Sequence, residues 1–529
     1  MTVLFHTFQK IAQAYHNKTA IISDNKHYTY QALEQLSLQW SATLASLSST
    51  PRVALLTEAP LNTAALSLAI AKLGTTCVPT NPQLTKEQLA SGWQATDVSI
   101  VIYEQEFSAK VQQCMSLPSM ESVQFINVEA LIEQAKQGSS SIKSTEQNAS
   151  DNKHTEHSSD QDDFIITLSS GSTGAPKPIA LSQQSKLSRA QQSWQLYDIN
   201  ETDTVLCASP FFHSLGQRLF FVPLLKGCTL VHLKHFTPQR WLLAVENHKV
   251  SKVISVSSHL YALKDELLLN AKQLQSLKTI VTSSAPIDNH FKEQLFNAVG
   301  CDFHEMYGAT EVATATNLYP KYAKEKHTSV GTPCPNVAIK ILDEDKSELP
   351  CNSIGEIAVK SPLVFNGYYH KKQLTQSSFK DGYFLTGDLG KIAQDGFLTY
   401  VGRKKDIIIS GGINIYPKDI ETTIAKHQAV KEVAVIGVDD KFLGEVILAV
   451  CVAQFPAETD QQQAVKSLEK ELRRVANKTL APFQRPLKYY FEQSLPLTAS
   501  GKTSKLLLRE QYNSLDEDWS APLRAMLFR

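Results

Sequence analysis

A short glycine-rich segment carries the residues best suited to chemistry. The stretch SSGSTGAPK occupies residues 169–177 and follows 164–168, an apolar and β-branched run that predicts a buried strand. Glycines in such a turn let the backbone approach an anion closely, hydroxyl groups donate hydrogen bonds to it, and Lys177 adds positive charge. The segment predicts a polyphosphate site, with a plain connecting turn as the alternative.

The spacing of this segment differs from that of the common NTPase loop, Gly-x-x-x-x-Gly-Lys-Ser/Thr. The chain has a single Gly-Lys-Thr, at residues 501–503, and Pro496 stands where that loop requires its first glycine. The sequence therefore excludes that loop and leaves residues 169–177 as the phosphate candidate.

Two other segments carry groups that nucleotides need. In HEMYGATE, Tyr307 can stack on a purine, Thr310 can bond a phosphate and Glu311 can hold a hard cation such as magnesium. The run 383–388 ends in Asp388, whose carboxylate can accept both ribose hydroxyls. Structural alternatives stand beside both: a strand end with a satisfied glutamate, and a turn aspartate bonded to its own backbone.

Cationic and aromatic segments add further candidates. GRKKD contains Arg403 and Lys405 and is either a hinge with a ligand contact or a solvated linker. Lys502 ends the polar loop LPLTASGK. His213 lies in PFFHSLG, where it lines a pocket wall or orients a bound carboxylate. A Ser–His–Asp triad is not indicated, because the chain has no Gly-x-Ser-x-Gly elbow.

These candidate residues must be held by an alternating series of strands and helices. Apolar runs at 204–208, 229–233, 253–256 and 279–283 predict buried strands, and helical spacing of apolar residues separates such runs along the first part of the chain. Alternation of this kind predicts an α/β fold with parallel crossovers.

The pattern of predicted secondary structure changes twice further along the chain. Short strands with tight turns between about 337 and 401 predict a small β-rich unit, and an α+β pattern follows from Asp406. We therefore place a domain boundary just before Asp406, which divides the chain into domains 1–402 and 403–529.

Composition places the chain among ordinary globular proteins. It has 529 residues, 42% of them apolar, and its 52 Lys and Arg equal its 52 Asp and Glu, so no electrostatic case exists for nucleic acid or an anionic membrane. Eight scattered cysteines without a Cys-x-x-Cys pair indicate a reducing compartment. Without a signal peptide or an apolar run of about 18 residues, the expected location is cytoplasmic. Residues 137–163 are almost devoid of apolar side chains and predict a disordered surface loop.

In their order along the chain, these segments resemble the adenylate-forming superfamily of acyl- and aryl-CoA synthetases, peptide-synthetase adenylation domains and beetle luciferases. The resemblance rests on SSGSTGAPK, PFFHSLG, YGATE, TGD, GRKKDIIISGGINIYPKDIE and LPLTASGK and spans nearly the whole chain. It implies a large N-terminal domain of α/β subdomains with a small β-rich unit, followed by a small mobile α+β C-terminal lid. In such enzymes a carboxylate attacks the α-phosphate of ATP to give an acyl-adenylate and pyrophosphate, and a thiol then displaces AMP.

The resemblance also implies a role for each motif residue. Lys502 would bridge the carboxylate and the α-phosphate, and Asp388 and Arg403 would hold the ribose. The residues expected to bind the ATP phosphates are Ser169, Ser170, Gly171, Ser172, Thr173, Gly174 and Lys177. Those expected beside adenine are Ser284, Ala285, Pro286 and Tyr307. The expected catalytic residues are Lys502, Thr310, Glu311 and His213, with Glu311 as the Mg²⁺ ligand.

The lid and the acyl pocket follow from the same resemblance. Lys405 would lie at the hinge, and Gly411 and Gly412 would line the approach of the thiol, where side chains would block a narrow tunnel. Arg218 either faces the acyl pocket or forms a surface salt bridge. The expected pocket residues are His213, Ser214, Gly216, Ser257, Ser283 and Gly308.

Within the superfamily the sequence favours an ATP-dependent acid–CoA ligase that activates a fatty or aromatic acid with the help of Mg²⁺. An aspartate for the α-ammonium group of an amino acid is absent near His213, and no carrier-protein segment follows the lid. The alternatives are an acyl-AMP ligase that loads a separate carrier protein and a non-catalytic nucleotide sensor. Neither a nucleic-acid partner nor a membrane span is expected, and the identity of the acid stays open.

Overall fold

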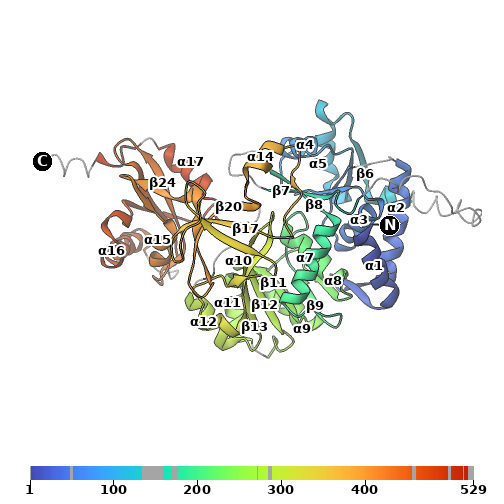
Figure 1. Cartoon of the computed structure of the whole chain (residues 1–529), viewed down its shortest axis with the longest axis horizontal. Coiled ribbons are helices and arrows are strands. Elements are labelled where there is room, and N and C mark those ends of the chain that lie inside the picture. Colours follow the sequence, from blue (N-terminus) through green and yellow to red (C-terminus); the bar gives the residue numbers. More distant parts are fainter. Residues whose placement is uncertain are drawn as a thin grey trace, which may run out of the picture. The chain divides into compact units, whose positions relative to one another are not determined.

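The computed structural model falls into two compact units (Figure 1). Unit 1 comprises Met1–His327, Gly331–Ala338 and Lys360–Phe384, and unit 2 comprises Thr328–Val330, Ile339–Val359 and Leu385–Arg529. The described residues are 2–47, 52–133, 159–169, 177–270, 272–283, 287, 289–455, 460–498, 502–515 and 517–521. The predictions for residues 170–176 and 284–286, and for 137–158 of the predicted disordered loop 137–163, lie outside the described residues. Residues 159–163 form a turn and the first residue of a strand, which corrects the loop prediction at its end.

One sheet of unit 1 has seven strands in the order β18-β8-β7-β4-β3-β5-β6. The strands from β7 to β6 run parallel, and β8 and β18 pair antiparallel at one side. Helix α3, which joins β3 to β4, is buried along most of its length and accordingly carries apolar residues on all its faces. The strands are β3 (Arg52–Leu56), β4 (Thr76–Pro79), β5 (Ile100–Tyr103), β6 (Gln124–Asn127), β7 (Asp163–Ser169), β8 (Lys177–Ser182) and β18 (Gly367–Tyr368).

The second sheet of unit 1 has nine strands in the order β15-β14-β13-β12-β11-β9-β10-β1-β2. The strands from β13 to β1 run parallel, and antiparallel strands close both edges. The four predicted strands between 204 and 283 are confirmed here as β9 to β12. The strands are β1 (Thr19–Ser23), β2 (Lys26–Thr29), β9 (Thr204–Cys207), β10 (Thr229–His232), β11 (Lys252–Val256), β12 (Thr279–Ser283), β13 (Asp302–Ala309), β14 (Ala313–Leu318) and β15 (Thr332–Pro333).

Helices join and cover the strands of unit 1, as parallel crossovers require. They are α1 (Val3–Ala14), α2 (Tyr30–Leu47), α3 (Pro60–Leu73), α4 (Lys86–Gln94), α5 (Ser108–Met115), α7 (Gln183–Leu196), α8 (Ser214–Leu224), α9 (Pro238–His248), α10 (Ser257–Ala262), α11 (Lys264–Leu269), α12 (Asn289–Ala298), α13 (Pro320–Ala323) and α14 (Lys372–Ser377). None of the helices in the described ranges has both the length and the apolar character to cross a membrane.

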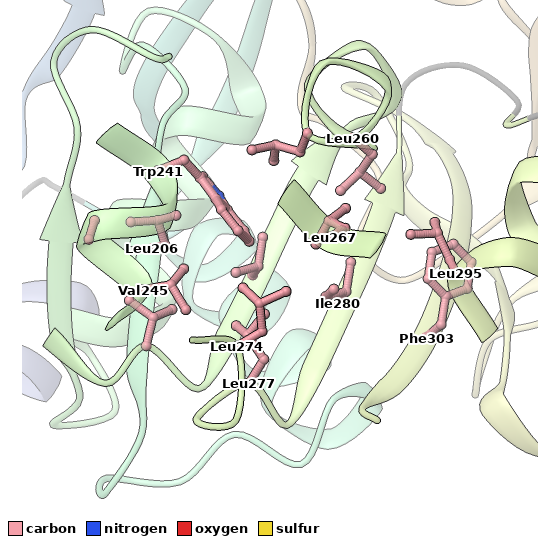
Figure 2. Packing of buried hydrophobic residues seen from close by; sticks show 14 of the residues in the cluster. Leu206, Trp241, Val245, Leu260, Leu267, Leu274, Leu277, Ile280, Leu295 and Phe303 are labelled. Atoms are coloured by element: carbon pink, nitrogen blue, oxygen red, sulfur yellow. The ribbon is translucent and has the colours of Figure 1, made fainter. Parts of the chain in front are cut away.

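The packed core on one face of the nine-stranded sheet holds these strands in register (Figure 2). Trp241 of α9 packs in one buried cluster with Leu206 of β9, Leu267 of α11 and Ile280 of β12. Helix α9 starts where the Thr237 hydroxyl accepts a hydrogen bond from the backbone of the first turn. The cluster anchors the strands whose carboxyl ends carry the predicted pocket residues.

The middle of the chain forms a sheet in which β16, β17 and β20 are neighbours and β21 pairs antiparallel with β20. This confirms the predicted β-rich unit between 337 and 401. The strands are β16 (Ala338–Leu342), β17 (Gly355–Lys360), β20 (Tyr383–Ile392) and β21 (Leu398–Arg403). The chain passes between the compact units for the last time after Phe384, and the domain boundary after residue 402 stays a prediction.

The last part of the chain is a five-stranded sheet with helices on both faces. Residues of β24 alternate between the faces: Val435 packs with α15 and α16, whereas Ala434 and Ile436 pack with α17. The predicted α+β pattern is therefore confirmed. Its elements are β22 (Ile408–Ser410), β23 (Ile413–Ile415), α15 (Pro417–Ile424), β24 (Val430–Asp440), β25 (Gly444–Ala453), α16 (Gln461–Thr479), β26 (Lys488–Glu492) and α17 (Lys505–Asn513).

We predict that Trp241→Ala destabilises unit 1 strongly. The Trp241 side chain is 1% exposed, and its removal leaves a cavity that costs about 3–5 kcal/mol of unfolding free energy. Leu243→Ala, on the same helix but 52% exposed, is the matched control and should change stability by less than about 0.5 kcal/mol. Thermal and denaturant unfolding measure both variants, and equal losses would contradict this packing.

Candidate active site

The predicted acyl-pocket residues collect at the carboxyl ends of neighbouring parallel strands. Ser283 is the last residue of β12 and pairs in register with Val256 of β11, which Ser257 follows directly. Gly308 lies near the end of β13, the next strand, and Ser214 begins α8 after β9. Because the carboxyl ends of parallel strands share one edge, the fold brings these predicted residues together.

Two of these glycines have a second, structural reason to be glycine. A Cβ on Gly216 would lie 1.9 Å from the backbone oxygen of Pro210, and one on Gly308 would lie 1.9 Å from that of Ala313. Either contact would displace the backbone, so both glycines permit close approach of two chain segments. Their direct contact with an acyl group stays a prediction.

Lys177 and Glu311, which are far apart in sequence, meet around one tyrosine. Lys177 opens β8, which pairs with β18, and its Nζ lies 5.5 Å from the centre of the Tyr368 ring. The Tyr368 hydroxyl donates a hydrogen bond of 2.9 Å to Oε1 of Glu311. Burial and then the Glu311 charge raise the pKa of Tyr368, which keeps the phenol protonated as a donor.

The backbone that presents Glu311 is clamped by a buried arginine. Arg189 of α7 donates to the carbonyl oxygen of Thr310 at 2.7 Å and to that of Glu311 at 3.2 Å. It also donates through Nε and Nη2 to the carbonyl of Leu363, at 3.1 and 2.6 Å. The guanidinium fork therefore fixes the turn that carries the predicted phosphate and metal ligands.

Sequence reasoning missed both Tyr368 and Arg189. Tyr368 stands in no pattern that signals a ligand, and its contact to Glu311 depends on the pairing of β18 with β8. Arg189 lies on a helix rich in polar residues, QQSKLSRAQQSWQL, which is nevertheless buried along most of its length. The one sequence signal that could have pointed to Arg189 is its spacing from Lys186, since cations at i and i+3 share a helix face.

The predicted purine contact, Tyr307, lies within β13 opposite Thr316 and is 8% exposed. Its predicted neighbours, residues 284–286, lie outside the described residues. Of the phosphate turn, Lys177 is described in full and Ser169 by its backbone alone. The adenine and phosphate contacts therefore stay predictions at these positions.

In unit 2, Asp388 and Arg403 face each other across a strand pair. They are register partners in β20 and β21, and Nε of Arg403 lies 2.9 Å from Oδ1 of Asp388. The alternative of a turn aspartate is wrong, because β20 continues to Ile392. The Asp388 side chain is 4% exposed, so its ion pair satisfies a charge that burial would otherwise penalise.

Lys502 belongs to the same electrostatic group. Two hydrogen bonds hold its backbone: Thr498 donates its N–H to the Lys502 carbonyl at 2.7 Å, and Lys502 donates its N–H to the Thr498 hydroxyl at 3.2 Å. The residue is accessible to solvent, yet surrounding protein atoms and then Arg403 lower the pKa of its amine, with Asp388 acting in the opposite direction.

The predicted hinge and thiol residues have local structural partners. The carbonyl of Lys405 accepts a hydrogen bond of 3.1 Å from Arg509. Gly411 and Gly412 form the two-residue turn between β22 and β23, with φ angles of +57° and +77°. A turn of this kind requires positive φ at both positions, which favours glycine. Their roles in lid movement and thiol access stay predictions.

His213 and Arg218 frame the start of α8. His213 precedes the helix, and its ring lies 4.5 Å from that of Phe212. The surface salt bridge expected as one alternative for Arg218 is wrong: its Nη1 donates to the Thr314 hydroxyl at 3.0 Å and to the Met306 sulfur at 3.2 Å. Helix α8 turns this side chain inward, toward β13 and β14.

The Glu311 environment suits a magnesium ion that is shared with phosphate. Within the described ranges, no group of three or more His, Cys, Asp or Glu side chains could form a complete metal cage. One Glu311 oxygen accepts from Tyr368, and the other has no protein donor in the described part of the chain. A single carboxylate that acts together with substrate phosphates is a usual way for proteins to bind magnesium.

Comparison with known proteins agrees with this arrangement. The profile of AMP-binding enzymes matches residues 8–369, and that of the AMP-binding enzyme C-terminal domain matches 419–502. A long-chain-fatty-acid–CoA ligase of Bacillus subtilis is 32% identical over 66% of this chain, although the match spans only 62% of that ligase. A 2-succinylbenzoate–CoA ligase of Listeria monocytogenes is 29% identical over 96% of this chain and 99% of its own length.

A solved structure is similar over nearly the whole chain. It is the o-succinylbenzoate CoA synthetase of Bacillus subtilis in complex with the acyl-adenylate intermediate OSB-AMP. It is 26% identical, covers 97% of this chain and 98% of its own, and superimposes with a TM-score of 0.81. The similarity therefore extends to the fold of both matched domains.

We predict that the pKa of Lys502 responds in opposite directions to its two neighbours. Arg403→Met removes a repulsive cation and should raise this pKa, whereas Asp388→Asn removes an attractive charge and should lower it further. The pH dependence of Lys502 acetylation, followed by peptide mass spectrometry, should shift to higher and lower pH respectively. The exposed Lys470 is the internal control, and parallel shifts in both variants would refute the assigned contacts.

Proposed function

The chain belongs to the AMP-binding enzyme family of adenylate-forming acyl- and aryl-CoA synthetases, and from this premise we propose that it is an ATP-dependent carboxylic acid–CoA ligase. It joins a carboxylic acid to AMP with release of pyrophosphate and then transfers the acyl group to the thiol of CoA. The observation that carries the proposal is the joint placement of Lys177, Tyr368 and Glu311 at one site of unit 1.

Unit 1 supplies the groups that act on the phosphates. Attack at phosphorus asks a protein mainly to position the reactants and to stabilise charge. Lys177 and the turn 169–174 bind the β- and γ-phosphates, and Thr310 contacts the α-phosphate. Glu311, oriented by the Tyr368 hydrogen bond, holds the magnesium ion. When bound, that ion neutralises charge on the phosphate oxygens.

Unit 2 supplies the groups that act on the ribose and the reacting carboxylate. Asp388 accepts hydrogen bonds from the ribose hydroxyls, and Arg403 holds its carboxylate in place. Lys502 bridges the substrate carboxylate and the α-phosphate, where a cation stabilises the charge that develops during attack. Tyr307 of unit 1, with residues 284–286, contacts the adenine.

The second half-reaction is thiolysis of the acyl-adenylate. The thiol of CoA loses its proton and attacks the acyl carbon, the bond between that carbon and the phosphate oxygen of AMP breaks, and AMP leaves with the electron pair. We propose that domain 403–529 moves between the two half-reactions about Lys405, and that Gly411 and Gly412 line the thiol's approach.

We also propose that the protein acts in the cytoplasm. All eight of its cysteines are unpaired, which is usual in a reducing compartment.

The class of acid is proposed to be fatty or aromatic. The relatives support both, since one is named for long-chain fatty acids and another for 2-succinylbenzoate. Ser214, Ser257 and Ser283 would line the acyl pocket near His213.

The decisive experiment is a pyrophosphate-release screen with ATP, Mg²⁺ and a panel of linear and aromatic acids, each with and without CoA. The expected result is pyrophosphate release with at least one acid and a thioester when CoA is present. Pyrophosphate without a thioester would point to a carrier protein as acceptor. Release of ADP, or no turnover with any acid, would overturn the proposal.

Lys502→Ala should separate the two half-reactions. Loss of its charge should slow acyl-adenylate formation on the order of 10²–10³-fold or more, while thiolysis of a supplied acyl-adenylate should change far less. Stopped assays of each half-reaction test this, with Lys470→Ala on the exposed face of α16 as the control. Equal impairment of both steps would contradict a role confined to adenylation.

Tyr368→Phe should weaken magnesium use while the fold is kept. Loss of the hydrogen bond that orients a metal-binding carboxylate typically costs about 10–100-fold in metal affinity or activity. Titration of adenylation against free Mg²⁺ should show a higher requirement. The control is Tyr369→Phe, which loses only a hydrogen bond to Asp97. An unchanged Mg²⁺ requirement in Tyr368→Phe would show that Tyr368 does not orient the metal-binding carboxylate.

A further inference from the structure

Arg218 is a basic side chain of unit 1 whose hydrogen bonds, among the described residues, go only to a hydroxyl and a sulfur atom. It lies one turn after Ser214 on α8, so the two side chains share a helix face. Both line a small pocket together with Lys186, Arg189 and Phe221. The Arg218 guanidinium also touches Met306, the residue before Tyr307 in β13. Arg218 therefore lies beside Ser214, one of the residues predicted to contact the acyl group.

The charge of Arg218 is not balanced by the protein. Across the described ranges no carboxylate forms an ion pair with it, and its hydrogen bonds to Thr314 and Met306 both use Nη1. Nε and Nη2 have no acceptor in the same part of the chain. Because burial of a charged side chain is costly without a partner, an uncompensated arginine at a pocket points to a ligand that supplies the negative charge.

Two further basic side chains line the same pocket, and neither supplies a negative charge to Arg218. Lys186 donates to the side-chain oxygen of Gln217, and Arg189 donates four hydrogen bonds to backbone carbonyl oxygens. Both bond to neutral oxygens, and burial lowers the pKa of Lys186 well below its usual value, while the Glu311 carboxylate favours the charge on Arg189. Burial raises the pKa of Tyr197 and of Cys334, so the two acidic groups nearest to Arg218 stay neutral.

The contacts of Lys186, Arg189 and Arg218 indicate different roles. Lys186 is tied through Gln217 to Thr167, on the strand before the phosphate turn, and Arg189 is tied to the Glu311 turn. These two therefore serve as scaffold. Arg218 alone keeps two N–H-bearing nitrogens available at the pocket, in the planar geometry that binds a carboxylate through two parallel hydrogen bonds.

We propose that Arg218 binds a second carboxylate at the distal end of the acid substrate, so that the enzyme activates dicarboxylic acids in preference to monocarboxylic acids of the same length. This inference rests on the proposed acid–CoA ligase function. One carboxylate of the diacid reacts with ATP, and the other pairs with Arg218. A neutral distal end leaves the guanidinium without its counter-charge and is bound more weakly.

The test compares matched acids. Succinate, adipate and suberate are paired with butanoate, hexanoate and octanoate, 4-carboxyphenylpropanoate with phenylpropanoate, and adipate with its monomethyl ester. Wild type should show a kcat/KM for pyrophosphate release that is higher for the preferred diacid by on the order of 10²-fold or more. Arg218→Met should abolish this preference by lowering kcat/KM far more for the diacid than for the matched monoacid, and Arg218→Lys should retain part of the preference.

Two controls separate recognition from structure. Arg240→Met removes an exposed arginine of α9 and should leave the preference unchanged. Calorimetric titration of the same acids, in the presence of AMP, reports binding independently of turnover. If Arg218 had only a structural role, its replacement would weaken the binding of diacids and monoacids alike.

The outcomes are distinct. Pyrophosphate release without a diacid preference, or a preference that survives in Arg218→Met, overturns the inference and leaves the ligase proposal standing. If no acid releases pyrophosphate, the ligase proposal fails, and calorimetry decides the inference alone. Diacid binding that Arg218→Met abolishes supports it, and binding that is absent or unchanged by that substitution overturns it.

Discussion

The site in unit 1 depends on the guanidinium of Arg189. This side chain is 6% exposed and donates to backbone oxygens of two chain segments, the turn at Thr310 and Glu311 and the loop at Leu363. Burial and the nearby Arg218 lower its pKa to about 9, yet it stays protonated at neutral pH. Because carbonyl oxygens satisfy its N–H groups, the charge is tolerated and the Glu311 turn is held rigidly. The Tyr368 hydrogen bond can then orient the Glu311 carboxylate.

Unit 1 thus gathers basic side chains where an anionic substrate is expected. Among the described residues, Lys186, Arg189 and Arg218 bond to amide, carbonyl, hydroxyl and sulfur acceptors and form no ion pair with a carboxylate. In a protein interior such an arrangement is unfavourable until an anion binds, because solvent no longer screens the charges. The phosphates of ATP and the carboxylate groups of an acid are anions of this kind, so binding would relieve an electrostatic cost present in the free protein.

Unit 2 uses a different device. Asp388 and Arg403 neutralise each other across the β20–β21 pair, so the carboxylate is buried at low cost and keeps a fixed direction. Both charges act on the pKa of Lys502, and Arg403 has the larger effect of the two. A lysine whose charge is disfavoured in this way gains more from an anionic partner than an ordinary surface lysine would. This makes it suited to a reaction in which negative charge develops on phosphate and carboxylate oxygens.

The sequence by itself determined the fold class, the family, and most strands and helices of both units, because local hydrophobic periodicity and the order of the motifs carry that information. It also pointed to Lys177, Glu311, Asp388 and Lys502, since glycine-rich and charged motifs mark them. Only the tertiary structure decided how these residues are supported. Tyr368 meets Glu311 through the pairing of β18 with β8, and Asp388 meets Arg403 through the register of β20 and β21. The direction of Arg218 depends on how α8 packs on β13 and β14. Contacts of this kind arise from long-range packing and strand register, which no local pattern of residues encodes.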